Sequence, residues 1–144
     1  MKNIKRYAFI VCLFLLAVSG YTQESNFKII VNEGNEINSI TSDQVSRIFL
    51  KKMTKWDNGV KISPVDLAAS SDLRENFTKK IHGKSISAIN AYWQKKIFTG
   101  KGVPPIEQSS EKDVIEFVKN NPGAIGYVSA NTNTSGVKVL KVVK

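Results

Sequence analysis

Short runs of apolar, β-branched residues recur along the chain, separated by stretches in which apolar residues follow a helical spacing. Runs of this kind, bounded by turn-forming residues, are typical of strands. Four of them predict strands, over residues 27–31, 60–67, 124–129 and 137–143. Pro64 lies within the second run. Because proline has no N–H to donate to a strand ladder, we expect an edge position or an irregularity there.

Four segments between these runs carry their apolar residues on one face of a helix. They predict helices over about residues 42–53, 71–82, 87–98 and 110–121. Ser71 or Asp72 can cap the second helix by accepting backbone N–H groups, and Ser110 can cap the fourth. Gly83 favours a stop for the second helix, because glycine readily takes the left-handed conformation that ends many helices.

Strands and helices therefore alternate along the chain, and no internal repeat or linker divides it. Residues 99–105, TGKGVPP, and the polar residues 130–136 predict surface loops. This order predicts one compact α/β domain, with a mostly parallel or mixed sheet covered by helices on both faces.

The first 22 residues predict a secretory signal peptide. Lys2, Lys5 and Arg6 precede an apolar run over residues 7–18. This run is shorter than the roughly 18 residues of a membrane-spanning helix, so cleavage is expected after Gly20 or Thr22 rather than anchoring. A cut after Thr22 leaves a domain of residues 23–144, located in the periplasm or secreted, with no stable membrane insertion.

The charge of the chain favours anionic partners. Its formal net charge is +9, and removal of the three basic residues of the signal lowers this to +6. A surplus of this size steers anions toward the protein, whether small oxyanions, acidic envelope polymers or nucleic acid. No basic stripe interleaved with aromatic residues and no helix-turn-helix or zinc signature is found, so nucleic acid is not expected as a partner.

The inventory of reactive side chains is thin. Cys12, the one cysteine, leaves with the signal, and His82 is the one histidine. A zinc site and a thiol nucleophile are therefore excluded from the processed domain. His82 falls at the end of the second predicted helix, where a capping or surface role is expected because a helix C-terminus favours a cation. We expect no enzyme activity, cofactor or metal.

One segment, residues 68–77 (AASSDLRENF), has the composition of an oxyanion site. Ser70 and Ser71 stand where a strand gives way to a helix, and Arg74 follows one turn later. Unpaired N–H groups at a helix start, two hydroxyls and a guanidinium are the donors that bind oxyanions. The alternative is that Ser71 only caps the helix and Arg74 makes a surface ion pair.

Three segments together resemble the phosphate-binding proteins of phosphate ABC transporters, in the type II periplasmic binding protein family. They are IIVNEGNEINSITSDQVSRIFLKKMTKW over residues 29–56, ISPVDLAASSDLRENF over residues 62–77, and NNPGAIGYVS over residues 120–129. The likeness implies the fold of one lobe of such a protein. It also implies a substrate-binding role in phosphate transport, with Ser70, Ser71 and Arg74 as ligand-binding residues.

The sequence departs from the family at the anion loop. The family pattern is similar to R-x-D-G-S-G-T, and Leu67 and Ala69 stand here in place of its arginine and aspartate. Ser71 alone matches residue by residue, and Arg74 is displaced by one helical turn. The chain is also too short for the two lobes that enclose the ligand in full members of the family. Weak binding of phosphate or a similar oxyanion is therefore expected.

Two functions follow from these observations. In the first, the chain is a secreted substrate-binding protein for phosphate or a similar oxyanion, with a transporter as partner. In the second, it is an envelope interaction module on the same fold that binds another envelope protein and no small ligand. The sequence leaves the anion, the oligomeric state and the signal cleavage site open.

Overall fold

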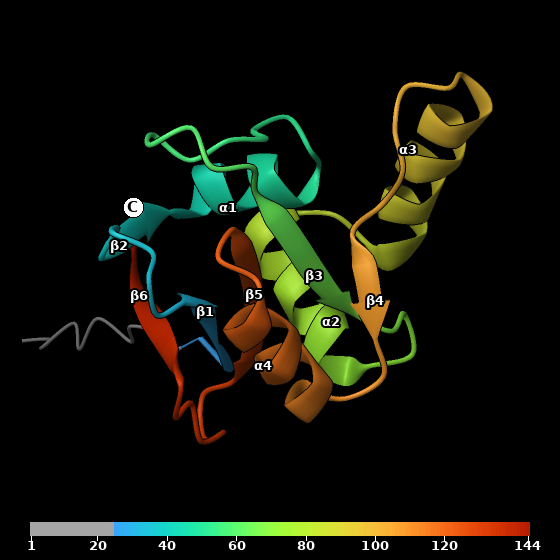
Figure 1. The fold of residues 1–144 in the computed structure, drawn as a ribbon. Coiled ribbons are helices and arrows are strands. Elements are labelled where there is room, and N and C mark those ends of the chain that lie inside the picture. Colours follow the sequence, from blue (N-terminus) through green and yellow to red (C-terminus); the bar gives the residue numbers. More distant parts are fainter. Residues whose placement is uncertain (1–24) are drawn as a thin grey trace, which may run out of the picture.

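The structure is a computed structural model that describes residues 25–144. The predicted signal peptide lies outside the described residues. Within them, six strands form one mixed sheet (Figure 1). The strands are β1 (Phe27–Asn32), β2 (Ser39–Thr41), β3 (Ser63–Leu67), β4 (Ile106–Gln108), β5 (Ala124–Ser129) and β6 (Val137–Val143).

The sheet has the order β2-β6-β1-β5-β3-β4. β1 is antiparallel to both β5 and β6, whereas β3 runs parallel to both of its neighbours, β5 and β4. β2 pairs in parallel with β6 at the other edge. The predicted strands are confirmed, with the second one shortened to β3.

Helices cover both faces of this sheet. They are α1 (Ser42–Phe49), α2 (Asp72–Phe77), the π-helical turn η1 (Thr78–His82), α3 (Ile86–Phe98) and α4 (Glu111–Asn120). Successive residues of a strand point to opposite faces. On β5, a Cβ added at Gly126 would lie 2.8 Å from Val114 of α4, while Tyr127 stacks on Phe77 of α2. The predicted single α/β domain is therefore confirmed.

The sequence predicts an edge position or an irregularity at Pro64, and an end of α1 near residue 53. β3 is an interior strand, so the edge alternative is wrong for the strand as a whole. At Pro64, however, β3 pairs with β5 only, and β4 joins from Val65 onward. The ring thus lies where β3 lacks its second neighbour. α1 ends at Phe49 and not near residue 53, because Lys51 takes a left-handed backbone conformation with φ of 53°.

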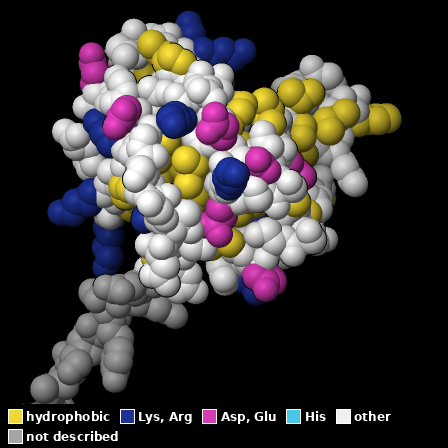
Figure 2. Space-filling view, turned by 60° about the horizontal axis from the view of Figure 1, so that its bottom comes forward, with side chains coloured by type: hydrophobic (Ala, Val, Ile, Leu, Met, Phe, Trp, Pro, Cys, Tyr) yellow, Lys and Arg dark blue, Asp and Glu magenta, His cyan; other side chains and the backbone are white. Residues whose placement is uncertain are grey.

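An aromatic cluster fills the core on the α2 side of the sheet. The Phe77 and Tyr127 rings stack with centroids 3.8 Å apart, and Phe27 and Phe49 pack around them. By contrast, α3 stands apart from the sheet and contacts the body through a small second cluster of Leu50, Ile89 and Trp93 (Figure 1). Figure 2 shows hydrophobic side chains exposed on the side of the molecule where α3 projects.

His82 is half-buried and is not the solvated cation expected from its place at a helix end. Its Nδ1 lies 2.8 Å from the Ser46 hydroxyl, and its ring packs edge-on against Phe77. Burial, reinforced by the positive charges of Arg74, Lys52 and Lys84, lowers the pKa of His82 to about 4. The neutral imidazole is therefore the folded form at neutral pH.

This shift predicts a loss of stability in mild acid. The unfolded chain takes up the proton near pH 6.5, whereas the folded chain resists it down to about pH 4. The contribution of His82 to stability is therefore complete above pH 6.5 and falls as pH decreases through this window. Because solvent screens part of the effect at this half-buried ring, the expected loss is about 1 kcal/mol between pH 7.5 and pH 5. Urea unfolding at the two pH values measures it. His82→Gln should flatten the difference, and an equal slope in both proteins would contradict the assignment.

Candidate functional site

The predicted anion loop lies at the carboxyl ends of β3 and β4. Ala68 donates its N–H to the carbonyl of Gln108 at 3.0 Å, which extends the pairing of the two parallel strands. Ser71 then donates to the carbonyl of Ala68 at 2.9 Å and turns the chain into α2. In α/β sheets, ligands bind outside the carboxyl ends of parallel strands. The β3–α2 loop, residues 68–71, therefore occupies the position of a ligand site.

The two serines differ in their surroundings. The Ser71 hydroxyl accepts the N–H of Arg74 at 3.3 Å and caps α2, as the sequence predicted. Its own hydrogen stays available to donate, because a hydroxyl both accepts and donates. Ser70 is exposed on the loop. Both hydroxyls lie at the start of α2, where the first backbone N–H groups have no partner within the helix.

Arg74 lies beneath this loop and is 4% exposed. Its Nη1 donates to the Leu67 carbonyl at 2.7 Å and to Glu107 Oε1 at 2.6 Å. Its Nε is buried without a hydrogen-bond partner, 3.5 Å from Asp66 Oδ2. The surface ion pair that the sequence offered as the alternative is thus corrected, because the guanidinium lies inside the protein and only Glu107 reaches solvent.

Asp66 and Tyr127 complete a buried polar network with Arg74. Asp66 Oδ1 accepts the Tyr127 hydroxyl and the Leu67 N–H. Burial raises the pKa of the Asp66 carboxyl, and the nearby Arg74 guanidinium opposes that rise. Burial and the Asp66 carboxyl also raise the pKa of Tyr127, so its phenol stays protonated and donates to the carboxyl. Two carboxyl groups thus surround one guanidinium.

Sequence reasoning missed three members of this network: Asp66, Glu107 and Tyr127. Asp66 gave a usable signal, since it is the one charged residue in the run VDL and a charged group within a buried strand needs a partner. Glu107 gave none. It lies on β4, a three-residue strand with no hydrophobic alternation, and reaches Arg74 only because β4 pairs with β3.

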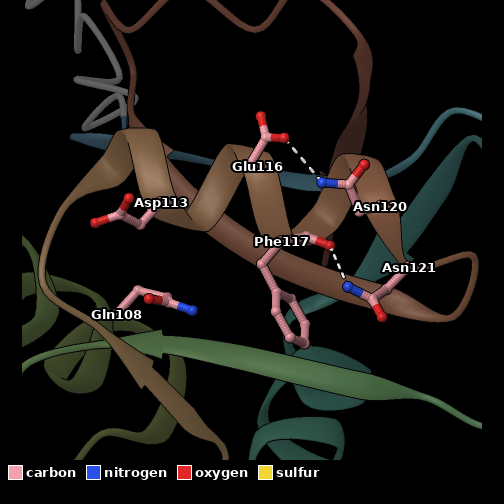
Figure 3. Close-up of a pocket in the computed structure, with 6 residues that line it drawn as sticks. All are labelled: Gln108, Asp113, Glu116, Phe117, Asn120 and Asn121. Atoms are coloured by element: carbon pink, nitrogen blue, oxygen red, sulfur yellow. Dashed lines mark hydrogen bonds between the residues drawn. The ribbon is translucent and has the colours of Figure 1, made fainter.

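A hollow lies on the α4 side of β4. Figure 3 shows its lining by side chains of both elements: Gln108, Asp113, Glu116, Phe117, Asn120 and Asn121. Asn120 donates to Glu116 at 2.9 Å, and Ser110 donates to Asp113 at 2.7 Å. Its two carboxylates repel anions. Among residues 25–144, no group of three or more His, Cys, Asp or Glu side chains is placed to hold a metal ion.

The comparisons with solved structures find the same fold in phosphate-binding proteins. An ABC-type phosphate transport receptor from Vibrio cholerae matches with a TM-score of 0.66 at 21% identity, over 81% of this chain and 46% of that one. A substrate-binding protein assigned to phosphate ABC transport in Clostridium perfringens, solved with bound phosphate, matches with a TM-score of 0.66 at 21% identity. The match covers 81% of this chain and 44% of that one. PstS from Borrelia burgdorferi matches with a TM-score of 0.57 at 22% identity, over 81% of this chain and 47% of that one.

The chain thus spans less than half the length of each of these proteins. No helix within the described part of the chain is both long and apolar enough to cross a membrane. A family model described as "PBP superfamily domain" matches residues 25–143, nearly all of the described chain. The resemblance recognised in the sequence is therefore confirmed, and the chain belongs to the PBP superfamily.

Proposed function

We propose that this chain is an exported binding protein, not an enzyme, which holds phosphate or a similar small oxyanion weakly at the β3–α2 loop and serves phosphate transport. Ser70, Ser71 and Arg74 are its ligand-binding residues. The observation that carries the proposal is the position of Arg74 under the start of α2. Its Nη1 already binds the half-exposed carboxylate of Glu107. A guanidinium that binds one carboxylate from the solvent side can bind another oxyanion there.

Glu107 also explains why the binding is weak. Its side chain is 48% exposed, so it can swing into solvent, but an incoming anion must first break its contact with Arg74. Asp66 adds a second negative group on the buried side. With Leu67 and Ala69 in place of the family's arginine and aspartate, Ser70 and Ser71 supply the remaining side-chain donors.

The proposal predicts that Glu107→Gln binds phosphate more tightly than the unaltered protein. Removal of the competing charge is worth on the order of 1 kcal/mol at a half-exposed ion pair, which is roughly fivefold in affinity. Isothermal titration with phosphate at low salt, with sulfate as the comparison anion, measures it. Ser71→Ala should weaken the binding in both backgrounds.

Glu75→Gln is the matched control, because it also removes one negative charge from the same region. Glu75 of α2 pairs at the surface with Lys79 of η1, whereas the carboxylates that pair with Arg74 are those of Asp66 and Glu107. Its removal should leave phosphate affinity nearly unchanged. If Glu75→Gln and Glu107→Gln act equally, only the overall charge matters and the site is not at Arg74.

The second candidate function is an interaction module that binds another envelope protein and no small anion. The observation that favours it is the same guanidinium, whose Nη1 already has two acceptors, the Leu67 carbonyl and Glu107. The titration separates the two functions. If folded Glu107→Gln protein gives no heat with millimolar phosphate, the oxyanion is dropped as the ligand and the interaction module is retained.

A further inference from the structure

We propose that the cavity between α1, β3 and the loop after α3 binds an aliphatic carboxylate, whose chain lies on the apolar walls and whose headgroup pairs with Lys51 and Lys61. The cavity has a volume of about 370 Å³, within the range of small-molecule sites. Its apolar walls come from distant parts of the chain and include Ile48, Met53, Ile62 and Val103. This site is separate from the β3–α2 loop.

Within residues 25–144, neither lysine at this cavity takes part in an ion pair with a carboxylate. Lys51 Nζ lies 3.4 Å from the Pro104 carbonyl, a long and neutral contact. Burial and the charge of Lys61 lower the pKa of Lys51, as expected where two ammonium groups face one partly dry space. An anion between them relieves this repulsion.

The backbone at Lys51 supports the same conclusion. It is the one non-glycine residue within the described part of the chain that has a positive φ, at 53°. Its N–H donates to the Ile48 carbonyl at 2.9 Å, which holds the turn after α1 in place. Glycine or asparagine is the usual residue at such a helix end, because most side chains with a Cβ are strained in this conformation. Lysine instead places an ammonium at the cavity.

The chemistry of the walls selects an aliphatic carboxylate over a phosphate. No arginine lines the cavity, and no helix begins there, so the planar and backbone donors of phosphate sites are missing among its lining residues. Lysine is a compact point charge without the planar fork by which arginine recognises a phosphate, so the apolar walls make the larger contribution to selection. Val103 and Ile106, 61% and 54% exposed, extend the apolar surface at the rim, where a hydrocarbon chain would cover them.

Titration with octanoate, followed by amide chemical shifts in solution NMR, tests the proposal. Octanoate should bind saturably, with shifts centred on residues around the cavity. Acetate, which keeps the charge without the chain, and 1-octanol, which keeps the chain without the charge, should each bind at least tenfold more weakly. Equal binding of octanoate and 1-octanol, or no saturable octanoate binding at millimolar concentration, would overturn the proposal.

Two cavity variants and one surface control locate the headgroup. Lys61→Gln removes an exposed ammonium without touching the core, and Lys51→Asn removes the other while keeping a residue that tolerates the left-handed backbone. Each should weaken octanoate binding at least fivefold, whereas Lys112→Gln on α4 should leave it unchanged. Octanoate affinity that is the same in both cavity variants as in the unaltered protein rejects the site. Ser71→Ala should affect phosphate only, which keeps this test independent of the β3–α2 loop.

Discussion

Arg74→Ala is expected to lower the free energy of unfolding by about 3–5 kcal/mol, the cost of removing one partner from a buried ion pair. The substitution leaves the Leu67 carbonyl without its donor at 2.7 Å and the 8% exposed Asp66 carboxyl without a nearby cation. Both groups lie on β3 inside the fold, where water does not replace the lost partner. Urea denaturation followed by far-UV circular dichroism measures the change.

The exposed ion pair between α2 and η1 provides the comparison. Lys79 lies 2.7 Å from Glu75 at an i,i+4 spacing, and both side chains are more than half exposed. Lys79→Ala should therefore change stability little, since solvent screens such pairs. If Arg74→Ala proves no more harmful than Lys79→Ala, the guanidinium does not hold β3 and α2 together. Asp66→Asn combined with Arg74→Met should recover part of the loss by removing both charges.

This expectation decides how the oxyanion site can be probed. A loss of phosphate binding in Arg74→Ala would have two explanations, a missing ligand group or a damaged fold. Glu107→Gln and Ser71→Ala avoid this ambiguity, because Glu107 is half exposed and Ser71 lies at the surface end of α2. Ser71→Ala carries the cost of a lost helix cap, about 1 kcal/mol, which a stable domain tolerates.

Phe77→Ala is expected to cost about 3–5 kcal/mol, as is typical for removal of a buried phenyl ring. Phe77 is 1% exposed and lies at the centre of the aromatic cluster, with its centroid 3.8 Å from that of Tyr127 and 4.9 Å from that of Phe49. The vacated volume cannot collapse easily, because the sheet closes it on one side and α1 on the other. The same urea titration measures the effect.

Phe98→Ala is the matched control. Phe98 ends α3 and is 93% exposed, so the same chemical change removes almost no buried surface. The unfolding free energy of the Phe98→Ala protein should equal that of the unaltered protein. A loss at Phe98→Ala comparable to that at Phe77→Ala would mean that the end of α3 packs against another part of the protein in solution.

Local patterns predicted the helices and the longer strands well. The caps found at Ser71 and Ser110 join a side chain to an N–H three residues later, and Gly83 ends the second helix in a left-handed conformation. Such contacts lie within one turn of chain, so a short stretch of sequence specifies them. β2 and β4 escaped prediction because each is three residues long and owes its conformation to the strand it pairs with.

The α/β order, the position of Ser71 at a helix start and the likeness to the phosphate-binding proteins can all be read from local patterns in the chain. The surroundings of Arg74 and Lys51 cannot, because they form only when distant segments pack together. Glu107 reaches Arg74 across 33 positions of sequence through the pairing of β3 with β4. Lys51 and Lys61 line the same cavity, together with residues of the loop after α3. These contacts depend on packing between distant segments, and local periodicity carries no information about them.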